Sequence, residues 1–215
     1  RAAKTSVTAL RRQADELDDE AENRFFQKRK AESGKRKLSA ADAGTAAHKF
    51  LQHFDFEKAA DLPSLEAETR RLEKENYLSA QEREVLNLES IAAFWNSEIG
   101  KKILAQKEFV RRELPFTAKF SPRELDEILE TQSPADLENE FVVIQGVADL
   151  AVILEKEIWL VDFKTDEFGA RDLPEKIKMY LPQLKLYARA LEKIYSRPAT
   201  DCRLHFLHAR KTVQI

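Results

Sequence analysis

Two neighbouring apolar segments, residues 141–154 and 158–165, carry charged side chains where a buried β-strand normally has none. Their composition predicts a β-hairpin whose strands are apolar on both faces, which is typical of a central, covered position in a sheet. Asp149 lies in the first strand, and Asp162 and Lys164 lie in the second. Burying these charges is costly unless they are paired or bind something. The hairpin therefore predicts both a covered sheet and a site within it.

The register of this hairpin predicts that the two aspartates are neighbours. A turn centred between Glu155 and Lys156 places Asp149 directly opposite Asp162, with Cβ atoms about 5 Å apart. Two carboxylates at that distance repel unless a cation lies between them, and their hard oxygens suit Mg²⁺ or Mn²⁺. Lys164 lies on the same face, where an ammonium can orient or activate a water molecule. The alternative is a buried Asp–Lys ion pair at a strand end, which needs no ligand.

The other segments predict helices before the hairpin, and helices and a strand after it. Helices are expected to begin near Thr45, Ser64, Ser79, Leu88 and Pro122 upstream, and near Pro174 and Pro182 downstream. Strands are expected over residues 108–120 and 202–208, and Pro115 restricts part of the first to a sheet edge or a bend. The predicted fold class is α/β, with a mixed central sheet flanked by helices and a helical N-terminal layer.

Composition excludes several classes of protein. Hydrophobic residues make up 43% of the 215 residues, so the chain can bury a sizeable core and is not disordered throughout. The net charge of −2 excludes a uniformly basic nucleic-acid binder but not a local basic groove. The single cysteine, Cys202, excludes an intrachain disulfide, a four-cysteine zinc site and a cysteine-ligated iron–sulfur cluster supplied by this chain alone.

The ends of the sequence bear on where the protein acts. No apolar signal segment opens the chain and residues 141–154 are too short to cross a membrane, so a cytoplasmic protein without a membrane partner is expected. The first residue is Arg rather than Met, which indicates a piece of a longer protein. Between positions 24 and 37, seven basic residues accompany one acidic residue. This run is either a solvated face or an arm that contacts phosphates.

Five short motifs, in order along the chain, resemble those of the nuclease superfamily named for its PD-(D/E)-x-K pattern. They are GTAAHKFL from Gly44, RELPF from Arg112, GVAD from Gly146, VDFKT from Val161 and QLKLY from Gln183. Their G-x-x-D, D-x-K-T and Q-x-x-x-Y spacing resembles the RecB-like branch most. The opening TSVTALR resembles the start of the nuclease domain of AddA-type helicase–nucleases. The missing cysteines separate the chain from AddB-type relatives, which carry an iron–sulfur cluster.

This resemblance implies roles for the charged residues of the hairpin and for one histidine outside it. His48, Asp149 and Asp162 match the metal ligands of the family, and the backbone carbonyl of Phe163 is a further expected ligand. Lys164 matches the catalytic lysine, and the two aspartates are expected to be catalytic through the metal. Without the motif around it, His48 would be read as an ordinary surface or structural histidine.

Three more residues are implied to shape the active site or contact DNA. Gln183 and Tyr187 are four residues apart and therefore share one face of a helix. Glu113 matches the glutamate of the family's E-x-P-F strand. The alternative for Gln183 and Tyr187 is capping and packing, and the alternative for Glu113 is an ordinary charge at a strand edge.

The fold implied by the resemblance is restriction-endonuclease-like. It assigns residues 39–215 to a RecB-like nuclease domain and residues 1–38 to an N-terminal helix and basic linker. The implied activity is Mg²⁺-dependent hydrolysis of DNA phosphodiesters, on single-stranded DNA or DNA ends, with Mn²⁺ able to replace Mg²⁺. The implied context is double-strand break repair by recombination, and the implied partners are a helicase domain in the same natural polypeptide and an AddB-like subunit. The alternatives are a stand-alone RecB-like exonuclease, or an inactive nuclease-fold module that only binds DNA or a partner.

Overall fold

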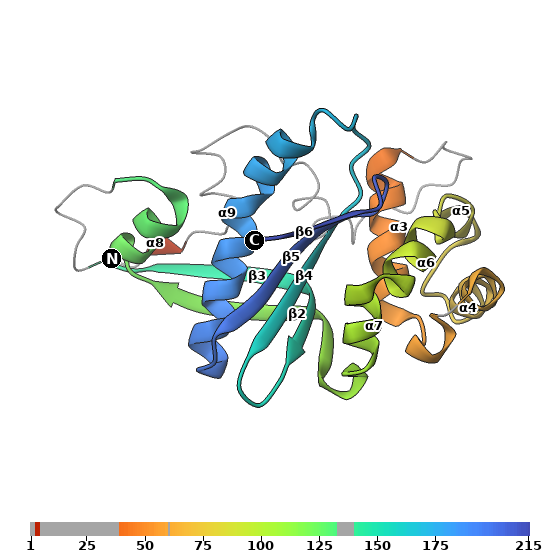
Figure 1. Cartoon of the computed structure of the whole chain (residues 1–215), viewed down its shortest axis with the longest axis horizontal. Coiled ribbons are helices and arrows are strands. Elements are labelled where there is room, and N and C mark those ends of the chain that lie inside the picture. Colours follow the sequence, from red (N-terminus) through yellow and green to blue (C-terminus); the bar gives the residue numbers. More distant parts are fainter. Residues whose placement is uncertain (1–2, 5–38, 60, 133–139) are drawn as a thin grey trace.

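A mixed sheet separates helices α3 to α7 on one face from helix α9 on the other (Figure 1). The computed structural model describes residues 3–4, 39–59, 61–132 and 140–215. Apart from residues 3–4, the expected N-terminal helix and basic linker lie outside the described residues. The α/β fold class with a central mixed sheet and a helical layer is confirmed. Within the described residues, no helix is long and apolar enough to cross a membrane.

The elements follow the expected order of helices, strand, hairpin, helix and strand. The helices are α3 (Ala40–His53), α4 (Leu62–Lys74), α5 (Ala80–Glu84), α6 (Leu88–Asn96), α7 (Glu98–Leu104), α8 (Pro122–Leu129) and α9 (Leu173–Tyr195), with 3-10 turns η1 (Phe56–Lys58) and η2 (Lys107–Phe109). The strands are β1 (Ala3–Lys4), β2 (Val110–Phe120), β3 (Val142–Ile153), β4 (Ile158–Lys164), β5 (Ala199–Phe206) and β6 (Lys211–Gln214).

Side-chain caps determine where several helices begin. Ser79 and Ser121 each form a reciprocal capping box with the residue three positions on, as their sequence spacing predicts. The first described helix begins earlier than expected, because Ser39 and Asp42 form a further capping box and α3 starts at Ala40. Gly44 lies inside this helix and is buried there, so the glycine does not mark the start of the helix.

Helix α9 runs without interruption for 23 residues and contains Pro182 in its interior. The expectation that a second helix begins at Pro182 is wrong. Proline removes one backbone hydrogen bond and disfavours a straight helix, so the helix needs support from elsewhere. Tyr180 and Leu184, on either side of the proline, are both buried in the core that α9 forms with the sheet. This packing on both sides keeps the helix continuous.

The strands of the sheet are ordered β1-β3-β4-β5-β6, with β2 paired to the other edge of β3. Strands β2 and β4 are antiparallel to β3, whereas β5 is parallel to β4 and follows it through α9. Pro115 lies in β2, which among the described strands pairs with β3 alone, so its predicted position on an edge strand is confirmed. The hairpin closes where the Leu154 amide donates to the Glu157 carbonyl. Leu150 then pairs with Val161, which is the register predicted from the sequence.

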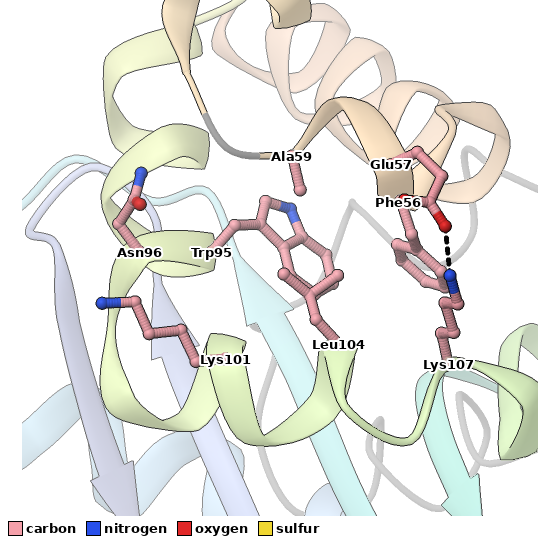
Figure 2. Close-up of a pocket in the computed structure, with 8 residues that line it drawn as sticks. All are labelled: Phe56, Glu57, Ala59, Trp95, Asn96, Lys101, Leu104 and Lys107. Atoms are coloured by element: carbon pink, nitrogen blue, oxygen red, sulfur yellow. Dashed lines mark hydrogen bonds and ion pairs between the residues drawn. The ribbon is translucent and has the colours of Figure 1, made fainter.

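The helical layer packs around Trp95, whose side chain is 1% exposed. Phe54, Phe56 and Phe94 surround its indole with ring centroids 4.9–5.3 Å away. A cavity of about 290 Å³ opens beside it, lined by Phe56, Glu57, Ala59, Trp95, Asn96, Lys101, Leu104 and Lys107 (Figure 2). No residue of the charged hairpin lines this cavity, so it is separate from the predicted site.

Close packing at Gly146 allows β2, β3 and α9 to meet. A Cβ atom at this position would lie 2.6 Å from Cζ of Phe116 and 3.1 Å from Cε1 of Tyr187. The Phe116 and Tyr187 rings contact edge to face, with centroids 5.0 Å apart. A side chain larger than hydrogen would therefore push these rings apart.

Gly146→Ala is accordingly expected to lower the free energy of unfolding by about 1–3 kcal/mol through overpacking. Gly169→Ala is the matched control, because its Cβ would meet only the exposed Asp172 carboxylate, at 3.2 Å. The control should stay within about 0.5 kcal/mol of the parent chain in urea unfolding. Equal stability of the two variants would contradict the packing role of Gly146.

A buried histidine makes the stability of the fold depend on pH. The ring of His205 on β5 is 3% exposed and packs against Phe94, with centroids 4.5 Å apart, while its Nδ1 lies 2.8 Å from the Thr212 hydroxyl. Burial lowers the pKa of His205 to about 4. The neutral ring is therefore the form that the folded state accommodates.

Because the unfolded chain binds this proton more readily, stability should be lost as the pH falls. The loss should begin near pH 6.5 and reach up to about 3 kcal/mol near pH 4. His205→Leu should remove this part of the pH dependence in urea unfolding, whereas His208→Leu, at a half-exposed ring, should keep it. An unchanged slope in His205→Leu would show that other groups cause the loss.

Candidate active site

The candidate site lies where β3 and β4 separate. The ladder between the two strands ends at Leu150 and Val161, one residue before the expected pair of aspartates. Beyond it, the Phe163 amide donates to Oδ2 of Asp149 at 2.7 Å, where a backbone carbonyl would accept in a regular ladder. Further along this edge of β3, β1 is the described strand that pairs, at Val142 and Val143. Within the described part of the chain, the edge between these two contacts has no strand beside it.

A backbone irregularity in β2 directs Glu113 into this site. Its φ angle is 47°, in the left-handed region that residues other than glycine rarely adopt. Val110 packs in the core of the helical layer and Leu114 packs in the α9 core, although regular alternation would place both on one face. Strand β3 changes face at the same level, since Ala148 lies in the α9 core and Leu150 in the other. In both strands, the side-chain alternation between the two faces of the sheet is therefore interrupted beside the site.

Helix α3 brings His48 to the same place. Arg112, next to Glu113 on β2, donates to the carbonyls of Leu51 at 3.2 Å and Phe54 at 2.6 Å, at the end of α3. These bonds hold the helix against the strand. The His48 side chain, one turn earlier in the helix than Leu51, is 7% exposed and faces the separated strands.

One imidazole nitrogen and two carboxylate oxygens converge in this site. Nδ1 of His48 lies 3.4 Å from Oδ1 of Asp149 and 3.5 Å from Oε1 of Glu113. One ligand atom from each residue lies within 4.8 Å of the others. Two carboxylates this close favour a cation between them, and their oxygens suit Mg²⁺ or Mn²⁺, while the imidazole nitrogen adds a softer donor. The residues therefore fit the divalent metal implied by the sequence motifs, with Glu113 rather than Asp162 as the third member of the cluster.

Asp162 belongs to a second, adjoining group built around Lys164. Nζ of Lys164 lies 3.2 Å from Oδ2 of Asp162 and donates to Oε1 of Gln183 at 2.9 Å. Nε2 of Gln183 in turn donates to the Tyr187 hydroxyl at 2.9 Å. All four side chains are buried. The Asp–Lys ion pair considered as an alternative is thus present, and it lies beside the metal-type cluster rather than in place of it.

The charge on Asp162 is sensitive to its surroundings. Burial raises the pKa of its carboxyl, Lys164 opposes that rise, and the negative charge of Asp149 adds to it. On balance the pKa is raised, so the ionised form is disfavoured, and the Lys164 ammonium is the main group that stabilises it. A cation in the adjoining cluster would favour the same ionised form.

The backbone of Phe163 faces the cluster. The Leu207 amide donates to the Lys164 carbonyl at 2.8 Å, so the backbone of Lys164 faces β5. Because successive residues of a strand direct their backbone groups to opposite edges, the amide and the carbonyl of Phe163 both face β3. The amide already contacts Asp149, and the carbonyl lies on the same edge, as a further ligand at this position requires.

The sequence did not single out Tyr180, which the structure places against Lys164. The Tyr180 ring centroid lies 4.1 Å from Nζ of Lys164, and the ring is 3% exposed. The available signal was its spacing, because it precedes Gln183 by three residues and so lies on the same helix face.

Known proteins are similar in sequence to this chain over almost all of its length. Residues 16–214 match the family described as the PD-(D/E)XK nuclease superfamily. The chain is 31% identical over 227 residues to an ATP-dependent helicase/nuclease subunit of Bacillus cytotoxicus, and 32% identical to the subunits of the same name from Bacillus mycoides, over 227 residues, and Listeria monocytogenes, over 226 residues. Each match covers 99% of this chain but only 18% of the relative. The separated strands, the His–carboxylate cluster and the buried lysine thus occur in a chain that belongs to the PD-(D/E)XK nuclease superfamily.

Proposed function

We propose that this chain is a metal-dependent deoxyribonuclease domain that hydrolyses DNA phosphodiesters with Mg²⁺, which Mn²⁺ can replace. The observation that carries the proposal is the convergence of His48, Glu113 and Asp149 next to a buried lysine. A structural ion pair explains Asp162 and Lys164 alone, but it does not explain two further carboxylates gathered around a histidine. Membership of a nuclease superfamily supports the same conclusion.

Five groups are proposed to hold the metal. His48, Glu113 and Asp149 are its central ligands, and Asp162 and the Phe163 carbonyl border the same space. A divalent cation bound here polarises a phosphate oxygen and lowers the pKa of a bound water. The left-handed backbone of Glu113 supports this role, because strained residues of this kind cluster at functional sites.

Lys164 is proposed as the catalytic lysine. Asp162 and Gln183 hold its ammonium from two directions, so the group is oriented before substrate arrives. A fixed positive charge there positions the attacking water and offsets the negative charge that develops on the phosphate oxygens. Gln183 and Tyr187 act in this scheme by orienting the lysine, and Tyr187 also packs on Phe116.

The wider context is also a proposal. The relatives are named as ATP-dependent helicase/nuclease subunits, and this chain spans 18% of their length. We propose that it serves as the cutting module of such a protein, acting on single-stranded DNA or DNA ends during double-strand break repair by recombination. The proposed protein partners are a helicase domain in the same polypeptide and an AddB-like subunit. The sequence contains no G-x-x-x-x-G-K-[ST] pattern, so another region has to supply the nucleotide-driven unwinding.

Two single variants should distinguish the residues that bind the metal from the residue that accelerates cleavage. Asp149→Asn should weaken Mn²⁺ binding, measured by titration calorimetry, at least about tenfold, because it removes a charged ligand from the cluster. Lys164→Met should bind Mn²⁺ as the parent chain does, yet cleave single-stranded DNA at least about a hundredfold more slowly, because it removes charge stabilisation at the phosphate.

The matched control for the lysine variant is Lys156→Met. This lysine is exposed in the turn at the opposite end of the same hairpin, and its replacement should leave both binding and cleavage unchanged. A parent chain that binds no divalent metal and cuts no DNA would instead identify an inactive nuclease-fold module.

Cleavage by this chain should not need ATP. A time course on long linear duplex DNA should show slow, distributive cutting that is equal with and without ATP, and faster cutting of single strands. Raising the salt concentration should slow it steeply, because a chain with a net charge of −2 depends on local basic contacts with phosphates. Processive or ATP-stimulated digestion by this chain alone would favour the stand-alone exonuclease.

A further inference from the structure

We propose that Tyr180 is a positioning residue that holds the Lys164 ammonium in its catalytic orientation. The inference rests on the proposed nuclease function. Its starting point is the contact between the two side chains, with Nζ 4.1 Å from the centre of the Tyr180 ring. Both groups are buried, and an ammonium over an aromatic face is attracted more strongly where water is excluded.

The ring completes the surroundings of the ammonium. A lysine ammonium has three N–H donors, and Gln183 and Asp162 approach it with oxygen atoms. The face of the Tyr180 ring covers another side of the ammonium. This face attracts the positive charge and cannot accept a proton from it. An aliphatic residue there would leave the ammonium free to turn away from the cluster, or would admit water beside it.

The ring itself is held in place from a different element. The Tyr180 hydroxyl donates to Oδ2 of Asp166 at 2.7 Å, and Oδ1 of Asp166 lies 3.3 Å from Nζ of Lys176. Asp166 follows the end of β4 by two residues, whereas Tyr180 and Lys176 lie on α9. These bonds fix the plane of the ring relative to the strand that carries Lys164.

The test compares Tyr180→Leu and Tyr180→Phe with Tyr195→Leu, which removes a partly buried tyrosine near the far end of α9. Tyr180→Leu should lower kcat on single-stranded DNA about tenfold, within the range of one desolvated cation–aromatic contact. KM and the Mn²⁺ affinity should stay within about twofold, because the cluster and the DNA contacts remain. Tyr180→Phe keeps the ring and should restore most of kcat, and Tyr195→Leu should change neither constant.

A second measurement tests the contact without cleavage. Urea unfolding of the parent chain, Lys164→Met, Tyr180→Leu and the double variant should show non-additive losses, because the two residues share one interaction. If Tyr180→Leu does not fold, Tyr180→Met fills the same space with a flexible side chain and takes its place.

The outcomes separate this inference from the proposed function. A parent chain that cuts DNA, with Tyr180→Leu equally active, would overturn the role of Tyr180 alone. Equal losses in kcat and in metal affinity, or additive unfolding energies, would also overturn it by showing a general structural role. A parent chain without cleavage would overturn the function, and the unfolding cycle would then decide whether the two side chains interact.

Discussion

The bond from the Phe163 amide to the Asp149 carboxylate separates the two central strands, and the candidate site depends on that separation. In a continuous ladder, a backbone carbonyl of β3 would accept this amide and the strands would stay side by side. Here a side chain accepts it, so β4 diverges from β3 after the Leu150–Val161 pair. The other oxygen of Asp149 is left to face His48, and Glu113 turns toward the same point through its left-handed backbone. This one hydrogen bond therefore ends the β3–β4 ladder and orients the Asp149 carboxylate in the site.

This arrangement costs stability, and the two cores compensate for the cost. Burial disfavours the charge on Asp162, and the Glu113 backbone conformation adds strain of about 1–3 kcal/mol. The helices α3 to α7 cover one face of the sheet and α9 covers the other, each with its own apolar cluster (Figure 1). The charged groups lie at the level where β2 and β3 change from one cluster to the other. The site is thus buried enough to strengthen its electrostatic interactions and is still supported by packing on both sides.

Side chains of helix α9 contact Lys164 and connect it to the rest of the fold. Its buried face carries Tyr180, Gln183 and Tyr187 at spacings of three and four residues, so all three meet the sheet together. Continuity through Pro182 is necessary for this alignment, because a break there would separate Tyr180 from Gln183. Gly146 on β3 leaves the space that the Tyr187 ring occupies. Packing between α9 and β3 is therefore coupled to the orientation of Lys164.

Much of this protein was predictable from local sequence. The alternation of side chains and the position of the turn determined the hairpin register, because a shift of one residue would move every side chain to the opposite face. Ser79 and Ser121 determined two helix starts, because capping boxes depend on residues only three positions apart. The motifs also indicated His48, Asp149 and Lys164 as site residues, and the structure places them around the separated strands. Tertiary structure alone decided the rest. The left-handed backbone of Glu113, its convergence with His48 and Asp149, the continuity of α9 through Pro182 and the position of Tyr180 all depend on contacts between elements distant in sequence. Local propensity does not contain those contacts.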